Sequence, residues 1–414
     1  MGKSSPIADL RGASRLAVDL TVLVTDAVET MHHTIARRPG ILGRAVPGPA
    51  RGITGFVYRS VRGVTRVVGG TIDAVLRPLE PLVAEVPAGP GRDAVVSALN
   101  GVLGDRLEAS GNPLAITMQL RIGGAPLVLK RATLAGMLPQ ARERVVVMVH
   151  GLCMNDAMWN RRQHDHGQRL AHDLRADAVY LHYNTGRHIH ANGAELATLL
   201  GQMVAAWPVP VREIVLVGHS MGGLVIRSAC AAAEAGRHAW MRSLRALVFL
   251  GTPHLGAPLE RGGHRLDLLF AASPYTVAFA RLGRLRSAGI MDLRHGAVRD
   301  HDTGDDADRA GRTQRAVPLP RDVPAFAIAG TLAKAAPASG RMPRGDGMVP
   351  VASALGVHDD PARALHIDPA RQSIACGTGH LELLSSEPVY ERMRTWLDGA
   401  LVAGSVARGG VTAA

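Results

Sequence analysis

The stretch Val217-Gly218-His219-Ser220-Met221-Gly222-Gly223 decides the fold of this chain. It follows an apolar run at 214–217 that predicts a buried strand, and it precedes a run of small and apolar residues at 223–231 that predicts a helix. A serine in the tight turn between such a strand and helix has a strained backbone and an exposed hydroxyl. Glycines two residues on either side are required, because a side chain there would collide with the strand or the helix. The pattern predicts a nucleophile elbow.

The composition is that of a globular protein. The chain has 414 residues, with 47% hydrophobic residues, 47 glycines and 25 prolines, which suits one large domain with an extension or two domains. Its formal net charge of +12 would suit a nucleic acid or an anionic membrane as partner. However, arginine is spread along the whole chain and aromatic residues make up only 3%, so there is no stacking platform for single strands. We expect no nucleic-acid partner.

Cysteine and histidine spacing gives no sign of a metal site. Cys153, Cys230 and Cys376 form neither a CxxC pair nor an even set, which argues against a zinc site and a disulfide framework. His188 and His190 form an isolated His-x-His without a carboxylate or cysteine at ligand spacing, and we interpret them as exposed loop histidines. We therefore expect no metal and no cofactor.

The sequence lacks a clear export or membrane-spanning signal. The apolar stretches near the N-terminus are interrupted by aspartates, and nowhere do about 18 apolar residues follow one another. These observations predict a cytoplasmic protein, with peripheral membrane association as the alternative.

Residues 1–110 are predicted to form a helical N-terminal extension. Within them, residues 53–76 carry apolar side chains at a spacing of three and four, and prolines follow at 78 and 81. The arginines of this segment lie mostly off the apolar stripe, and a basic amphipathic helix of this kind can lie on an anionic membrane. The alternative is packing on another helix, such as residues 16–35, which the glycines of the segment favour because they weaken an isolated helix.

From residue 111 onward, strands and helices alternate. Residues 116–129 indicate a hairpin around Gly123-Gly124. The predicted strands that follow are residues 144–149, 178–183, 214–217, 246–250, 325–329 and 364–367, with helical stretches that include 194–207, 224–235 and 389–401. This alternation is typical of βαβ units and a mostly parallel sheet. We therefore assign 111–402 to one α/β domain and 403–414 to a flexible tail. Residues 258–321 interrupt the alternation and are predicted to be a cap or lid insertion, or else a surface excursion.

A serine nucleophile needs a histidine to take its proton, and that histidine needs an acid to fix its tautomer. In a sheet with a nucleophile elbow, the acid and then the histidine follow the serine on loops after later strands. Asp346 stands between two glycines after the strand 325–329, and His380 stands in a glycine-containing loop after the predicted strand 364–367. The competing acids are the aspartates of the charged run 300–308, and the competing histidines are His358 and His366.

The oxyanion formed during acyl transfer needs two preorganised backbone N–H donors. One is Met221, the residue after the serine. The other is expected in the loop after the strand 144–149, where Gly151 lets the backbone approach the substrate and Leu152 supplies the N–H. Cys153 stands beside the site without a role as nucleophile.

Five motifs together resemble the α/β-hydrolase superfamily. They are Val-His-Gly-Leu-Cys at 149–153, Gly-His-Ser-Met-Gly-Gly at 218–223, Gly-Thr-Pro-His-Leu-Gly at 251–256, Gly-Asp-Gly-Met-Val-Pro at 345–350 and Gly-His-Leu at 379–381. Within it, residues 140–400 resemble the bacterial lipase/esterase branch related to GPI inositol-deacylase domains. The resemblance implies an α/β-hydrolase fold and a triad of Ser220, Asp346 and His380. It also implies oxyanion donors at Leu152 and Met221, with His254 in the wall of the site.

These patterns predict a serine esterase or lipase that cleaves a carboxylic ester through an acyl-enzyme. Apolar residues of the insertion favour a lipid-like ester and a role in lipid metabolism, although they could equally be core; they are Leu266, Leu268, Leu269, Phe270 and Val277. One alternative is an acyltransferase or thioesterase that uses the same triad. Another is a membrane- or granule-associated scaffold that acts through the basic N-terminal helices.

Overall fold

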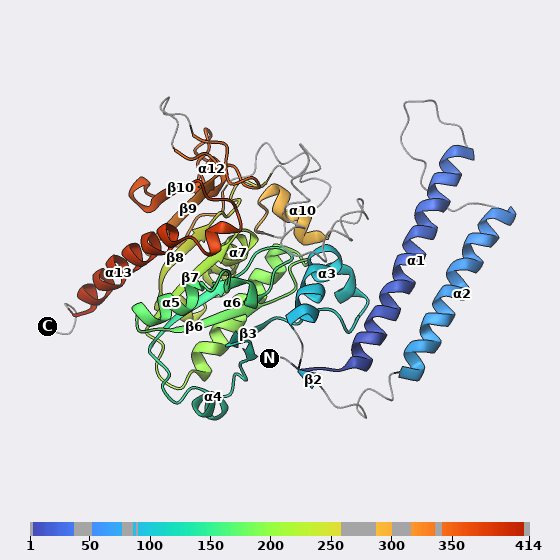
Figure 1. Cartoon of the computed structure of the whole chain (residues 1–414), viewed down its shortest axis with the longest axis horizontal. Helices are drawn as coiled ribbons and strands as arrows, with labels where there is room; N and C mark the ends of the chain where they lie inside the picture. The colour runs from blue at the N-terminus through green and yellow to red at the C-terminus, as the bar shows by residue number, and fades with distance from the viewer. Residues whose placement is uncertain are drawn as a thin grey trace. The chain divides into compact units, whose positions relative to one another are not determined.

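The computed structural model describes residues 3–36, 52–76, 86–87, 90–257, 287–299, 316–335 and 342–409 (Figure 1). The chain divides into two compact units. The helical unit comprises Gly2–Ala88 and Leu107–Ala115, and the sheet unit comprises Gly89–Arg106 and Ile116–Ala414.

The helical unit is built on two long helices that run antiparallel side by side, α1 (Pro6–Ala36) and α2 (Gly52–Leu76) (Figure 1). Asp73 near the end of α2 accepts hydrogen bonds from Arg15 and Arg11 near the start of α1. These two guanidinium groups lower the pKa of Asp73 to about 2. A short pair of strands, β1 (Lys3–Ser4) and β2 (Val86–Pro87), joins the two ends of the unit. The packing of α2 on α1 is the arrangement that the glycines of α2 favour.

The sheet unit contains an eight-stranded sheet in the order β10-β9-β8-β7-β5-β6-β3-β4. Its parallel strands are β5 (Arg144–Val149), β6 (Asp177–His182), β7 (Glu213–His219), β8 (Leu244–Leu250), β9 (Ala325–Thr331) and β10 (Gln372–Cys376). The hairpin of β3 (Gln119–Ile122) and β4 (Ala125–Pro126) adds antiparallel strands beside β6. The prediction of a mostly parallel central sheet flanked by helices is confirmed.

Helices cover the sheet and link its strands. The α-helices of the sheet unit are α3 (Pro90–Ala109, whose last turn belongs to the helical unit), α4 (Arg131–Met137), α5 (His166–Asp173), α6 (Ile189–Ala206), α7 (Met221–Ala235), α10 (Ala288–His295), α12 (Val351–Leu355) and α13 (Glu387–Gly409). Single 3₁₀ turns are η2 (Asp156–Trp159), η3 (Ala239–Ser243), η5 (Pro369–Arg371) and η6 (Glu382–Leu384). Among the described helices, none is both long enough and apolar enough to cross a bilayer.

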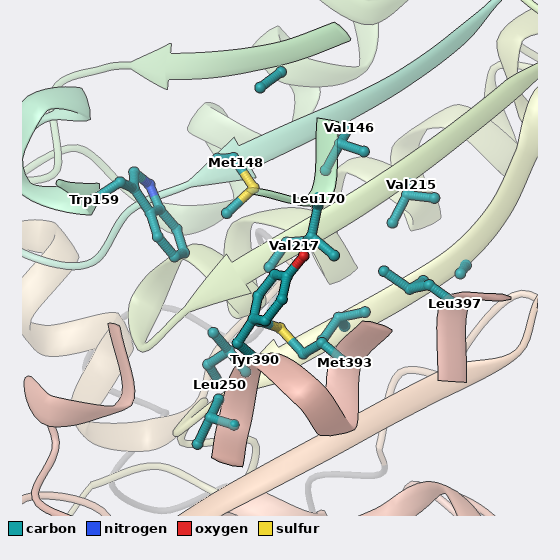
Figure 2. Packing of buried hydrophobic residues seen from close by; sticks show 14 of the residues in the cluster. Val146, Met148, Trp159, Leu170, Val215, Val217, Leu250, Tyr390, Met393 and Leu397 are labelled. Carbon is teal, nitrogen blue, oxygen red and sulfur yellow. The ribbon is translucent and has the colours of Figure 1, made fainter. Parts of the chain in front are cut away.

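The core explains why the central strands are apolar at successive positions. Val146, Met148, Val215 and Val217 alternate along β5 and β7 and pack in one cluster with residues of α5 and α13 (Figure 2). The residues between them are equally buried, on the side of the sheet that α7 contacts. Parallel strands buried on both faces produce such continuous apolar runs.

The predicted strand at 364–367 is wrong. These residues are irregular, and the last strand is β10, residues Gln372–Cys376. Leu365 and Ile367 are buried while His366 between them is exposed with φ +53°. The alternation therefore reflects packing of a loop, in which Leu365 N–H donates to Gly356 O (2.9 Å). The true strand is at the sheet edge and half-buried, so it carries no strong apolar signal.

Only part of the predicted insertion 258–321 lies among the described residues, namely 287–299, which contain α10, and 316–321. The apolar residues from Leu266 to Val277 and the acidic run at 300–308 lie outside the described residues. The predictions made for them therefore stay predictions.

Candidate active site

Ser220 occupies the sharp turn between β7 and α7. Its backbone has φ +54° and ψ −126°, a conformation that costs a non-glycine residue free energy and is typical of functional turns. Ser220 N–H donates to Leu250 O at the end of β8 (2.9 Å). A Cβ at Gly218 would lie 2.6 Å from Gly223 N, and one at Gly222 would overlap Val149 O. The two glycines let α7 approach the ends of β5 and β7, as the motif predicts.

His380 and Asp346 meet on the loops after β10 and β9. His380 Nδ1 lies 2.7 Å from Asp346 Oδ2, and both side chains are buried. Because a carboxylate only accepts hydrogen bonds, Nδ1 carries the proton and donates it. Nε2 is the nitrogen left to accept a proton, and within the described residues it has no hydrogen-bond partner. This is the tautomer that a general base requires.

The backbone around Gly251 brings the three predicted residues to one place. Gly251 follows Leu250, whose carbonyl accepts from Ser220 N–H. A Cβ at Gly251 would lie 3.2 Å from both Asp346 Oδ2 and His380 Cε1. From the other side, the His219 Nε2–H group donates to His380 O (3.1 Å). Ser220, Asp346 and His380 therefore gather at the carboxyl edge of the sheet, around the ends of β7 and β8.

Hydrogen bonds keep the Asp346 carboxylate ionised although it is buried. Burial raises its pKa, but the neighbouring His380 and the backbone N–H groups of Val349 and Met348 more than offset this, so the pKa lies below its usual value. Asp346 Oδ1 accepts from Met348 N (2.9 Å) and Val349 N (2.8 Å), which leaves Oδ2 for His380. Gly345 and Gly347 on either side have positive φ, the conformation that this turn requires.

The loop after β5 approaches Ser220 closely. A Cβ at Gly151 would lie 3.0 Å from Ser220 Cβ, so any larger residue would crowd Ser220. Tyr183 Oη donates to His150 O (2.7 Å) and holds the start of the loop. Burial lowers the pKa of His150 to about 3, so this ring is neutral and shapes the loop. Leu152, the residue after Gly151, is buried at the same place.

Met221 is the first residue of α7. Its N–H group therefore has no acceptor in a preceding turn of the helix, and it lies at the positive end of the helix dipole. On the other side of the serine in the chain, burial keeps His219 neutral, with a pKa of about 3. The first turn of α7 and the loop at Gly151 thus meet at Ser220, the arrangement that an oxyanion site requires.

The structure contains a buried ionic cluster after the loop at Gly151 that we did not predict from the sequence. Asp156 Oδ1 accepts from His182 Nδ1 (2.9 Å) and from Arg121 Nη1 (3.1 Å), and all three side chains are buried. Burial raises the pKa of Asp156, but His182 and Arg121 lower it by more. The sequence could have indicated this cluster through the polar residue in each of two neighbouring strands, Arg121 in β3 and His182 in β6. The cluster lies directly after the loop 150–155 and anchors its far end.

The structure also shows the surroundings of the other residues that the sequence singled out. His366 is exposed and its Nε2 lies near Pro361 O (2.9 Å), while His358 accepts from Asp360 N–H (2.9 Å). His254 is buried, packs edge-on against Phe249 and is covered by Arg227. All three cysteines are free thiols. His188 and His190 are partly buried, and Asp292 of α10 joins them, although no spacing in the sequence indicated this carboxylate.

A hollow in the surface lies at the amino ends of the strands and is not part of the site around Ser220. Arg245, Phe326 and Trp396 line it, together with the start of β8. Ser220 lies at the carboxyl ends of the strands, so this hollow is separated from it by the length of the sheet.

Comparisons with known proteins give one family and several solved structures. Residues 139–270 match the family described as "Putative serine esterase (DUF676)". The mature lipase BlEst2 of Bacillus licheniformis is 18% identical, with a TM-score of 0.40, and the match covers 67% of this chain and 98% of that chain. A thermophilic esterase of Thermogutta terrifontis is 18% identical with a TM-score of 0.36, covering 63% and 91%. The esterase of the archaeon Pyrobaculum calidifontis is 16% identical with a TM-score of 0.39, covering 64% and 78%. A search of curated protein sequences found no match.

Proposed function

We propose that the chain is a carboxylic ester hydrolase that works through an acyl-enzyme on Ser220, since residues 139–270 match a family described as putative serine esterases. His380 Nε2 takes the proton of the Ser220 hydroxyl while the oxygen attacks the ester carbonyl. Asp346 holds the His380 ring and stabilises its charged form. The N–H groups of Leu152 and Met221 donate to the oxyanion. His380 then protonates the leaving alcohol, and water releases the acid by the same steps.

One observation carries this proposal. The His380–Asp346 hydrogen bond of 2.7 Å is buried beside Gly251, and Gly251 follows the residue that binds the backbone of Ser220. A buried Asp–His pair next to a serine with φ +54° is costly for stability. Such an arrangement is expected where catalysis requires it.

The test replaces the nucleophile. Ser220→Ala should reduce kcat by at least about a thousandfold on a short-chain aryl ester, because the covalent step is lost. Ser243→Ala is the matched control: this hydroxyl lies just before β8, at the other edge of the sheet, and donates to Val211 O. Stoichiometric labelling by a fluorophosphonate should require Ser220 alone. Unchanged turnover by the Ser220→Ala protein would contradict the proposed mechanism.

Hydrolysis and acyl transfer share the first half of this mechanism. An acyltransferase would hand the acyl group to an added alcohol or thiol in preference to water. We favour hydrolysis because the family match is to esterases. Product analysis with glycerol or a thiol present distinguishes the two, since free acid as the main product supports hydrolysis. A series of esters of increasing chain length tests the lipid-like substrate: a rise of kcat/KM with chain length supports it.

A second proposal concerns the helical unit, which we infer contacts an anionic membrane surface. Val57, Val61, Val64 and Val68 follow one another at helical spacing on α2, and with Val67 they are between 42% and 69% exposed. Arg59 and Arg66 are exposed on the same helix. An apolar stripe with basic neighbours suits the interface of an anionic bilayer.

Two glutamates on this stripe test the membrane contact in the full chain. Val64→Glu with Val68→Glu should lower binding to phosphatidylserine vesicles at least about tenfold, because burying each valine contributes about 1.5 kcal/mol or more. Val128→Glu, on an exposed valine of the sheet unit, is the control. If co-sedimentation is equal for both proteins, the stripe is not the membrane contact.

A further inference from the structure

His188, His190 and Asp292 form a cluster of ligand-type side chains outside the proposed active site. One ligand atom from each of the three lies within 4.8 Å of the others. His188 Nδ1 lies 3.1 Å from Asp292 Oδ2. The rings of His188 and His190 stack with their centroids 5.1 Å apart. The cluster combines two imidazoles with one carboxylate.

The fold brings these residues together from separate segments. His188 directly precedes α6 and His190 lies in its first turn, whereas Asp292 comes from α10, within the predicted insertion. The Asp292 side chain is buried and that of His188 is 44% exposed. The carboxylate is therefore fixed, while the His188 imidazole has room to adjust and its side of the cluster is open to water.

We propose that His188, His190 and Asp292 bind one divalent transition-metal ion, with Zn²⁺ as the best fit. Imidazole and carboxylate are ligands that zinc prefers, at distances of roughly 2.0–2.2 Å. Two such ligands in a tetrahedral site lie roughly 3.3 Å apart, close to the 3.1 Å between His188 and Asp292. Water takes the fourth position on the open side. Ca²⁺ and Mg²⁺ are disfavoured, because they require mostly oxygen ligands.

A helix cap alone would explain part of this arrangement. Asp292 Oδ2 accepts from Ile189 N–H (2.8 Å) and so caps the start of α6. However, a carboxylate has about four lone-pair sites, and metal-bound carboxylates are commonly held by a further hydrogen bond of this kind. The cap also makes no use of His190, whose ring stacks on that of His188. The cap orients the carboxylate, and the second histidine completes the metal site.

The metal would join α10 to the body of the sheet unit. At its start, α10 is already bonded to the loop before α6, since Gly289 N–H donates to Gly186 O (3.0 Å). Near its end, Leu293 O accepts from Ala257 N–H (3.3 Å), in the segment that follows Gly251. A metal ion at Asp292 lies between these attachments. It would hold α10 against the same edge of the sheet that carries Ser220.

Zinc binding to the chelator-treated full chain, without an affinity tag that contains histidine, tests the proposal. Wild type should take up one Zn²⁺ per chain in competition with a chromogenic chelator, and Co²⁺ should give the visible bands of a four-coordinate site. His190→Gln should weaken binding at least about a hundredfold, since even changes outside the ligand set cost 10- to 100-fold. This variant keeps the Asp292 cap. His172→Gln is the control, because His172 also lies beside an aspartate, Asp173 (2.8 Å), but on the open surface.

Hydrogen exchange supplies a second readout, which does not depend on esterase activity. Zn²⁺ should slow the exchange of amides in α10 in wild type and in His172→Gln, but not in His190→Gln. Absence of stoichiometric zinc in wild type, or equal zinc binding by all three proteins, would overturn the proposal. A cap without a metal site predicts that outcome. The result is unaffected if Ser220 proves not to be the nucleophile.

Discussion

Three hydrogen-bond donors hold the Asp346 carboxylate in place. One carboxylate oxygen accepts from two backbone N–H groups and the other accepts from His380 Nδ1. This arrangement fixes which His380 nitrogen carries the proton. The neighbouring rings of His150 and His219 are buried and, with pKa values of about 3, are neutral at pH 7. They therefore place no positive charge beside the imidazolium that the proposed mechanism forms on His380.

Asp346→Asn tests the role of this carboxylate. The amide that replaces it offers an NH₂ group and disfavours the Nδ1–H tautomer, so His380 Nε2 would carry the proton and could not accept one from Ser220. We expect kcat to fall about 10⁴-fold at neutral pH with little change in KM. Asp368→Asn is the control, because Asp368 caps the exposed turn η5. A loss of less than about tenfold in the folded variant would assign the acid role to another residue.

At the scale of elements, the nucleophile turn depends on contacts between α7 and β5. A Cβ at Gly222 would overlap the carbonyl oxygens of Val149 and His150, and the overlap can be relieved only by moving backbone. We expect Gly222→Ala to abolish activity and to lower the stability of the sheet unit by about 1–3 kcal/mol, the usual cost of overpacking. Urea unfolding followed by tryptophan fluorescence measures the change.

Gly399→Ala is the matched control for this substitution. Gly399 lies in α13, and a Cβ there would have no neighbour within 4 Å. Alanine should therefore stabilise the helix by about 0.5–1 kcal/mol and leave turnover unchanged. If Gly222→Ala and Gly399→Ala had the same effects on turnover and stability, the close approach of α7 to β5 would not be the reason for glycine at position 222.

The elements that the sequence predicted well are those with a strong local cause. Central strands such as β5 and β7 are buried on both faces, so they read as apolar runs, and Ser220 lies in a turn with fixed glycine positions. The edge strand β10 is half-buried and has no such pattern, while the loop at 364–367 imitates one. Asp292 could not be paired with His188 from spacing, because their contact depends on how α10 packs more than 100 residues along the chain. The loops that carry Asp346 and His380 could be predicted only through the order rule of the hydrolase sheet.

For the whole molecule, buried histidines predict how stability depends on pH. Burial lowers the pKa of His150 and His219 to about 3 and that of His166 to about 4, from a usual value of 6.5. The unfolded chain binds these protons below about pH 6.5, whereas the folded chain does not until the pH is lower by several units. Stability is therefore fully present above pH 6.5 and is lost as the pH falls towards 4. All four tryptophans, at 159, 207, 240 and 396, lie in the sheet unit, so their fluorescence reports its unfolding.

His166→Gln isolates one contribution to this loss. His166 begins α5, and its Nε2 lies 2.8 Å from Leu383 O, just beyond the loop of His380. The variant should be less stable than wild type at pH 7.5, because glutamine fills the site less well. Between pH 7.5 and 4.5, however, its stability should fall by about 2 kcal/mol less than that of wild type, since the proton-linked cost of a pKa lowered to about 4 is removed. Ser243→Ala provides the control, because a hydroxyl does not titrate in this range, so its curve should run parallel to that of wild type. Parallel curves for His166→Gln and wild type would show that folding does not lower the pKa of His166, contrary to its burial.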